Sequence, residues 1–102
     1  TRGSPPQGPR AEGDDGREYY VRALAVVGPP ARSQLPTLTA ALDDLSPQVR
    51  SAAALAVWSL DGPVEKPVAV LIDLLRHNDE DIRREAARNL GLIGPRAEAA
   101  VP

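Results

Sequence analysis

The sequence predicts an all-α fold, an α-solenoid of stacked antiparallel helical hairpins with about five helices. One observation is internal repetition: a shift of 33 residues aligns residues 41–54 with residues 74–87. A shift of 66 residues aligns residues 27–31 with residues 93–97, and both segments contain a Gly-Pro pair. The other observation is that apolar residues recur every three or four positions, which is the spacing of one helix face. Units of this size cannot bury their apolar faces alone, so they stack.

The composition fits one small helical domain and excludes several classes of function. The 102 residues include sixteen Ala but no Phe, Met or Cys, so the core must be built from small side chains in close contact. The absence of Cys excludes disulfides and thiolate metal sites, and no cofactor is expected. The net charge is −2, and no apolar run approaches the ~20 residues that cross a bilayer. Neither nucleic acid nor a membrane is therefore expected as a partner.

The chain divides into a polar tail and a repeat array. Residues 1–16 are rich in Gly and Pro and hold no large apolar residue, so we expect a disordered tail or linker. The array fills residues 17–102, and its expected units are a partial repeat 17–34, repeat 35–66, repeat 67–101 and the start of a further repeat at 102. Because the chain opens on Thr1 and stops where a unit would begin, we expect a fragment whose uncapped repeat ends favour self-association.

The first expected helix begins at Arg17 and ends before Gly28-Pro29-Pro30, because Pro disfavours helical geometry in the residue before it. Of the neighbouring Tyr19 and Tyr20, one should face inward and one outward, and both should help to cover the N-terminal face of the array. The inward stripe is expected to consist of Tyr20, Val21, Leu24 and Val27.

The first complete hairpin is expected to follow. Ser46 is the N-cap of its second helix, and Pro47 takes the first helical position, where its missing N–H costs nothing. Asp61-Gly62-Pro63 ends that helix. The inward stripes of the two helices are expected to be Leu35, Leu38, Leu42 and Leu45, then Val49, Ala53, Val57 and Leu60.

The second hairpin repeats this plan. Asp79 takes the cap position, Glu80 pairs with Arg84 one turn later, and Gly94-Pro95 ends the second helix. The inward stripes are expected to be Val68, Leu71, Ile72 and Leu75, then Ile82, Ala86, Leu90 and Ile93. A proline recurs near the start of the first helix of each unit, at Pro36, Pro67 and Pro102. The sequence leaves open whether each proline begins its helix or kinks it.

These features resemble the HEAT repeat, and the nearest likeness is to the short bacterial form called phycobilisome-lyase-like. The likeness depends on the helix-ending Gly-Pro pairs, on the cap-x-x-Val/Ile-Arg starts at residues 46–50 and 79–83, and on the Ala-Ala pairs that follow. The Thr-Pro-Leu-His signature of ankyrin repeats is absent, and the tetratricopeptide pattern also fails. The resemblance implies stacked hairpins whose second helices line a concave face. It also implies a family of scaffolds, adaptors, regulatory subunits and a few enzymes.

Arg17, Arg50 and Arg83 obey the 33-residue spacing strictly. One interpretation is a structural Arg ladder that hydrogen-bonds loop acids and helix-end carbonyls, and the other is a basic stripe for an acidic ligand. We favour the structural ladder, because a residue repeated with the fold usually serves the fold. The loop acid of the family motif is matched by Asp79 but is replaced by Ser46 in the earlier unit, so an acid ladder is not established at that step.

Three other features are given structural interpretations. His77 is the only histidine and lies at the end of a helix, where a cation would complement the helix dipole, so capping is favoured over catalysis or metal binding. Asp43 and Asp44 are adjacent, point in different directions on a helix and are expected to be solvated. Leu92 falls outside the inward stripe and is expected to be a single exposed Leu.

Residues that break the repeat are the better candidates for function. Superposing the second helices aligns Arg22, Leu55 and Arg88 in one column, with Trp58 in the next column between two small residues. Trp58 could anchor a partner together with the Arg side chains, but packing between repeats is the favoured interpretation of this ring. The candidates for partner binding on the concave face are Arg22, Leu55, Trp58, Arg84 and Arg88.

The predicted function is a non-catalytic scaffold or adaptor that binds another protein or peptide on the concave face. One alternative is a structural repeat segment of a larger regulatory protein. The other is a lyase-like HEAT protein associated with a chromophore or an enzyme. A single His, no Cys and no convergent acid–base group count against this last alternative.

Overall fold

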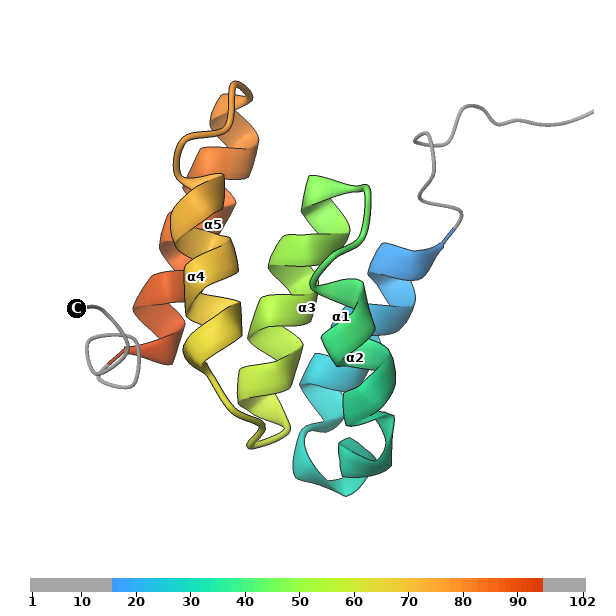
Figure 1. Ribbon diagram of the computed structural model, residues 1–102. Coiled ribbons are helices and arrows are strands. Elements are labelled where there is room, and N and C mark those ends of the chain that lie inside the picture. The colour runs from blue at the N-terminus through green and yellow to red at the C-terminus, as the bar shows by residue number, and fades with distance from the viewer. Residues whose placement is uncertain (1–15, 95–102) are drawn as a thin grey trace, which may run out of the picture.

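The computed structural model describes residues 16–94, which form a two-layered array of helices without strands (Figure 1). One layer holds α1, α3 and α5 with α3 between the other two, and α2 and α4 form the second layer. Since α3 packs against all four other α-helices, it is the centre of the array. The predicted all-α solenoid of antiparallel hairpins is confirmed. The elements are α1 (Arg17–Val27), the 3₁₀ helix η1 (Pro29–Gln34), α2 (Leu35–Ala41), α3 (Pro47–Ser59), α4 (Glu65–Leu74) and α5 (Glu80–Ile93).

Glycines end α1 and α5, as the sequence predicts. Gly28 follows α1 with φ 75° and ψ −146°, and Gly94 follows α5 with φ 61° and ψ −130°. Residues with a Cβ disfavour both conformations. The two amides donate to Leu24 O and Leu90 O, each at 3.0 Å, so the last helical turns stay hydrogen-bonded while the chain leaves the helix.

Side chains cap the N-termini of α3 and α5, the second helices of the two hairpins. The Ser46 hydroxyl accepts a hydrogen bond from Val49 N at 3.3 Å, and the Asp79 carboxylate accepts one from Asp81 N at 2.8 Å. Glu80 pairs with Arg84 at 2.9 Å. The two predicted N-caps and the predicted i,i+4 pair are therefore confirmed.

The recurring prolines begin their helices. Pro36 is the second residue of α2 and Pro67 is the third residue of α4. Amides in the first turn have no partner within the helix, so Pro loses nothing there. The third proline of the set, Pro102, lies outside the described residues.

The core is built from the inward stripes of α3 and α5, as predicted. Three of the four α5 positions are fully buried, and Leu90 is partly buried. The helices of the second layer contribute Leu38, Val68 and Leu71, and Leu42, the residue after α2, is buried as well. The buried stripe residues of α3 and α5 are Val49, Ala53, Val57, Leu60, Ile82, Ala86 and Ile93.

Four residues assigned to inward stripes are exposed instead, and all four lie near helix ends. Tyr20 and Val27 are exposed because α1 turns only Val21, and in part Leu24, toward the core. Leu45 lies in the loop beyond the end of α2, where helical spacing no longer applies. Leu75 follows the end of α4, and Leu74 takes the inward position.

The expectation that one of the two tyrosines faces inward is also wrong. Tyr19 is exposed like Tyr20, whose hydroxyl donates to Gln34 Oε1 at 2.9 Å across the turn to η1. Both rings can lie outside the core because Val21 and Leu24 already fill the inward face of α1.

The turn between α3 and α4 requires a glycine for reasons of space. A Cβ on buried Gly62 would lie 2.8 Å from Val57 Cγ1 and 2.9 Å from Leu35 Cδ2. Both distances are shorter than carbon atoms tolerate. The turn therefore closes tightly on α2 and α3 only because residue 62 has no side chain.

Two properties of residues 16–94 bear on function. Within this range no helix is both long enough and apolar enough to cross a membrane. In the same range no three His, Cys, Asp or Glu side chains come together to hold a metal ion. Most of the predicted tail, residues 1–15, lies outside the described part of the chain.

Candidate functional site

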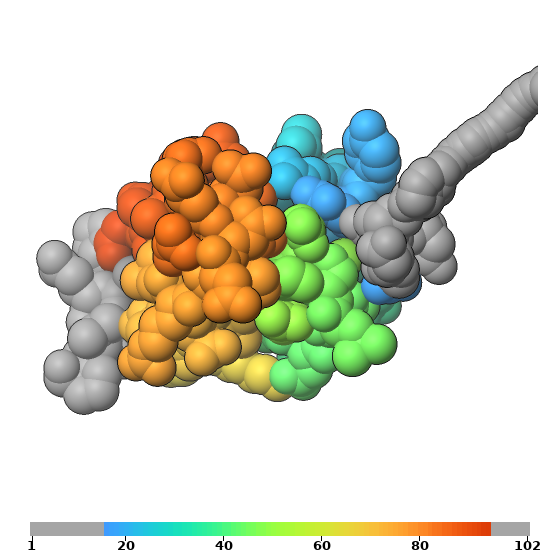
Figure 2. Space-filling model, turned by 90° about the horizontal axis from the view of Figure 1, so that it is seen from above, coloured from blue at the N-terminus to red at the C-terminus, as the bar shows by residue number. Residues whose placement is uncertain are grey.

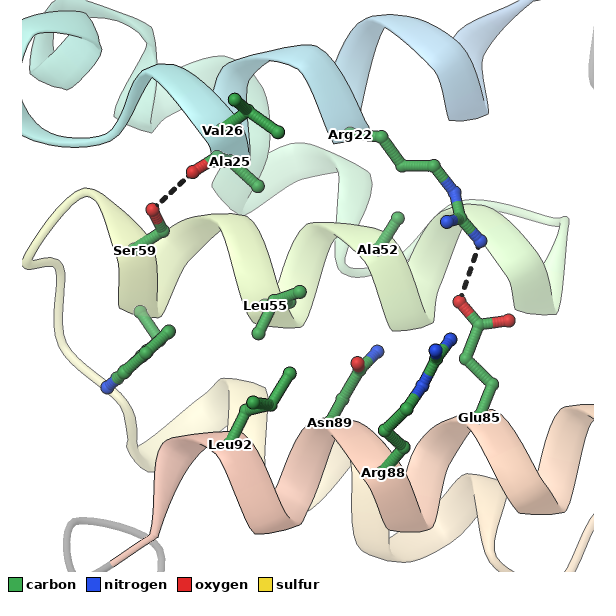
Figure 3. Close-up of a pocket in the computed structure, with 11 residues that line it drawn as sticks. Arg22, Ala25, Val26, Ala52, Leu55, Ser59, Glu85, Arg88, Asn89 and Leu92 are labelled. Carbon is green, nitrogen blue, oxygen red and sulfur yellow. Dashed lines mark hydrogen bonds and ion pairs between the residues drawn. The ribbon is translucent and has the colours of Figure 1, made fainter.

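A groove of about 310 Å³ opens on the face formed by α1, α3 and α5. Figure 2 shows α1 in blue and α5 in orange on the same flank of the molecule, although the two helices lie at opposite ends of the described chain. In Figure 3 the three helices run side by side, with α3 as the floor and the other two as walls. The lining residues are Arg22, Ala25, Val26, Ala52, Leu55, Trp58, Ser59, Glu85, Arg88, Asn89 and Leu92.

One end of the groove is charged. Arg22 on α1 donates from Nη2 to Glu85 Oε2 on α5 at 2.8 Å, so this ion pair crosses between the walls (Figure 3). The Arg22 Nε also donates to Glu18 Oε2 on its own helix at 2.8 Å. Arg88 extends from α5 at the same end of the groove, and its guanidinium makes no hydrogen bond or ion pair with residues 16–94.

The other end of the groove is apolar. Val26 on α1 is 87% exposed and Leu92 on α5 is 53% exposed, and they flank Leu55 of the floor (Figure 3). Trp58 lines the same groove and is partly buried against the core. Its ring therefore has both a packing surface and a groove surface, so the two interpretations of Trp58 are not exclusive.

Polar contacts hold the floor to both walls. The Ser59 hydroxyl on α3 donates to Ala25 O in the last turn of α1. Asn89 on α5 donates from Nδ2 to Ser51 Oγ at 2.9 Å and to Ser51 O at 3.3 Å, and both side chains are buried. Breaking a buried hydrogen bond of this kind leaves a polar group unpaired at a cost of about 1–3 kcal/mol. These bonds therefore make the groove a fixed surface.

The structure brings together four of the five sequence-predicted site residues. Arg22, Leu55, Trp58 and Arg88 all line the groove. Arg84 does not, because its side chain is exposed and pairs with Glu80 and Asp81 in the first turn of α5.

Sequence reasoning missed the apolar walls. Val26 and Leu92 line the groove, yet Leu92 is expected from the sequence to be a single exposed Leu. The missing signal is a further column of the same superposition: Val26, Ser59 and Leu92 are spaced by 33 residues, and all three line the groove. Glu85 was missed as well, and no local pattern predicts its pairing with Arg22, 63 residues away.

The three residues of the predicted structural Arg ladder lie outside the groove, and two of them, Arg50 and Arg83, bond to loop carbonyls. Arg50 donates from Nη1 to Asp44 O at 2.8 Å and to Leu45 O at 3.2 Å. Arg83 makes the equivalent bonds one unit later, to His77 O at 2.7 Å and Asn78 O at 2.9 Å. Each guanidinium therefore holds the loop in front of its own helix.

The loop acid differs from the expected one. Arg17 pairs side-on with Asp44, with Nε–Oδ1 and Nη2–Oδ2 both at 3.0 Å, so the acid lies two residues before the cap. The expectation that Asp44 is solvated is therefore wrong. Its side chain is partly buried and links α1 to the next hairpin. Asp43 is exposed and pairs with Lys66 at 2.9 Å.

The pKa of Asp44 is lowered. Burial alone would raise it, but the hydrogen bond from Ser46 N at 2.8 Å favours the carboxylate. The hydrogen bond and charge of Arg17, together with the charge of Arg50, lower the pKa further. In the folded protein the Asp44 side chain therefore stays ionised at pH values where an ordinary Asp would begin to take up a proton.

His77 occupies the position of Asp44 in the next unit. Its Nδ1 accepts a hydrogen bond from Asp79 N at 3.0 Å, just as Asp44 accepts one from Ser46 N. The side chain therefore bonds to an amide of the loop before α5. An imidazole cannot form the two-oxygen pairing that Arg17 makes with Asp44, and the acid ladder is interrupted at this step.

Comparison with known proteins identifies the repeat. A family model described as HEAT repeats matches residues 10–91, which is most of the chain. No curated protein and no solved structure matches the chain.

Proposed function

Because this chain belongs to the HEAT repeat family, we propose that it is a non-catalytic scaffold or adaptor that binds a segment of a partner protein in the groove between α1, α3 and α5. HEAT repeats commonly serve as protein-interaction scaffolds, and the family is generally non-catalytic. The bound segment would lie along α3, between the walls formed by α1 and α5.

The observation that carries this proposal is the exposure of large apolar side chains on both walls of the groove. Val26 is 87% exposed and Leu92 is 53% exposed, although both residues line the groove. Contiguous exposed apolar surface rimmed by polar residues is typical of interaction sites. A partner side chain that fills the apolar end would cover both residues together with Leu55 and Trp58.

The chemistry of the lining residues supports binding rather than catalysis. Among the lining residues within 16–94, the one hydroxyl is on Ser59, and it donates to Ala25 O. The one carboxylate in this set is on Glu85, and it is held by Arg22. His77 lies in the loop between α4 and α5 and does not line the groove. A nucleophile and a free base are therefore not brought together there.

A peptide selection tests the proposal. Random twelve-residue peptides displayed on phage are selected against the immobilised full chain, and selected peptides are synthesised with a fluorophore for anisotropy titrations. We expect Val26→Glu to weaken binding at least tenfold, because it places a charge where about 1.5 kcal/mol or more of apolar contact would form.

The matched control is Leu45→Glu. Leu45 is 92% exposed, so it resembles Val26 in exposure, but it lies in the loop before α3 and outside the groove. Binding should be unchanged in this variant. Failure to select any peptide, or equal loss of affinity in both variants, would contradict the proposed function.

A further inference from the structure

We propose that the groove selects peptide segments carrying an acidic side chain and a large apolar side chain about one helical turn apart. The carboxylate would bind Arg88, and the apolar group would fill the end formed by Val26, Leu55 and Leu92. This inference rests on the proposed function and adds to it the chemistry of the partner.

Arg88 is the charged group of the groove that is left for a ligand. Across the groove, Arg22 is already engaged by Glu18 and Glu85. Glu85 lies three residues before Arg88 on α5, where the two could pair, but its carboxylate turns to Arg22 instead (Figure 3). Within residues 16–94, the two Arg and one Glu of the lining give a net charge of +1, and the uncompensated charge is that of Arg88.

The geometry of the guanidinium favours a carboxylate. Arg presents paired N–H groups in a plane, and a carboxylate accepts two of them at once. A basic segment would meet Arg88 and Arg22 without finding a free carboxylate, because Glu85 is already held. The groove therefore favours acidic over basic partners.

The distance between the two ends of the groove sets the spacing of the partner's residues. Arg88 and Leu92 are four positions apart on α5, as are Arg22 and Val26 on α1. The walls run side by side, and four residues rise about 6 Å along a helix (Figure 3).

A helical partner matches this spacing with residues three or four positions apart. An extended partner matches it with residues two positions apart, which are about 6.6 Å from each other on one face. Either conformation gives the same pairing of one acid with one apolar side chain.

The test compares two charge reversals on α5. Phage libraries of random twelve-residue peptides, with a blocked C-terminus, are selected in parallel against the wild-type chain, Arg88→Glu and Arg84→Glu. The two variants change net charge equally, and both side chains are exposed, but Arg84 lies outside the groove lining. A synthetic peptide from the wild-type selection is then titrated against all three proteins.

We expect peptides selected by the wild type and by Arg84→Glu to be enriched in Asp or Glu at one of the two spacings from a large apolar residue. Arg88→Glu should instead enrich Lys or Arg at that position and bind the wild-type peptide about tenfold more weakly, as for loss of a charge-assisted hydrogen bond. Replacing the acid of the peptide by Lys should restore affinity for Arg88→Glu.

Three outcomes would overturn the inference. One is selection of peptides without an acidic residue, and another is equal behaviour of Arg88→Glu and Arg84→Glu. The third is binding only from a library with a free C-terminus, which would assign the carboxylate to a chain end. If Val26→Glu still abolishes binding in these cases, the proposed function stands and only the acidic partner is refuted.

Discussion

Replacing Asp44 by Asn should destabilise the array far more than the same change at the adjacent Asp43. The Asn side chain keeps an oxygen that can accept from Ser46 N, so the substitution chiefly removes the charge that pairs with Arg17. Asp43→Asn removes the same charge from a pair with Lys66. The two variants are therefore matched in chemistry and in net charge.

The expected magnitudes follow from exposure and geometry. The side chains of Asp43 and Lys66 are 71% and 51% exposed, and such a pair contributes between about 0 and 1 kcal/mol. Asp44 and Arg17 are 16% and 37% exposed and pair through two contacts of 3.0 Å, which places them between surface and buried pairs. We expect Asp44→Asn to lower the free energy of unfolding by about 1–2 kcal/mol, which is a fall in Tm of several degrees for a domain of this size.

The measurement is urea unfolding followed by Trp58 emission, with the wild type and both variants at pH 7 and at lower pH. Because the pKa of Asp44 is lowered in the folded state, its contribution is fully present above the ordinary Asp pKa of about 3.9. The contribution is lost as pH falls through the lowered value. The gap between the wild type and Asp44→Asn should therefore close in acid.

Two results would refute this reasoning. One is an equal loss of stability in the two variants at pH 7, which would mean that the link from α1 to the first complete hairpin is no stronger than a surface pair. The other is a gap for Asp44→Asn that stays constant as the solution is acidified.

The remaining predictions concern the turn glycine and the interrupted ladder. Gly62→Ala should lower the free energy of unfolding by about 1–3 kcal/mol because its Cβ would meet Val57 and Leu35, and the same urea titration measures this. Gly91→Ala is the matched control: its Cβ would meet no atom within 4 Å in the interior of α5, so a gain of up to about 1 kcal/mol is expected. His77→Asp should give Arg50 the acid partner that Arg17 finds in Asp44, so a double-mutant cycle with Arg50→Ala should show a coupling of about 0.3–1 kcal/mol. Absence of coupling in that cycle would mean that the two loops do not share one geometry.

The proposed binding function and the ladder use different parts of each unit. The ladder Arg residues bond to carbonyls of loops, where the same geometry recurs in each hairpin. The groove is built from positions where the units differ, such as Arg22, Leu55 and Arg88. Arg88 makes no hydrogen bond or ion pair with residues 16–94, so reversing its charge removes no polar contact of the stack, and the charge reversal at Arg88 is a usable test of the proposed partner.

The sequence by itself determined the features that depend on neighbours within about four residues. These are the positions of the helices, the caps at Ser46 and Asp79, the glycine stops, and the burial of the stripes in the middle of α3 and α5. Hydrogen bonds from residue i to i+4 and the periodicity of one helix face are local, so they can be read from the sequence without knowing how the units pack.

Only the tertiary structure decided what happens at helix ends and between units. Leu45 has the spacing of a core residue but lies beyond the last turn of its helix, and Asp44 gains its role from Arg17, 27 residues away. The pairing of Arg22 with Glu85, which leaves Arg88 without a partner among residues 16–94, crosses 63 residues. Periodicity shows which side chains share a face of one helix. Which of them meet across two helices depends on how those helices are placed in space, and this placement decides the chemistry of the groove.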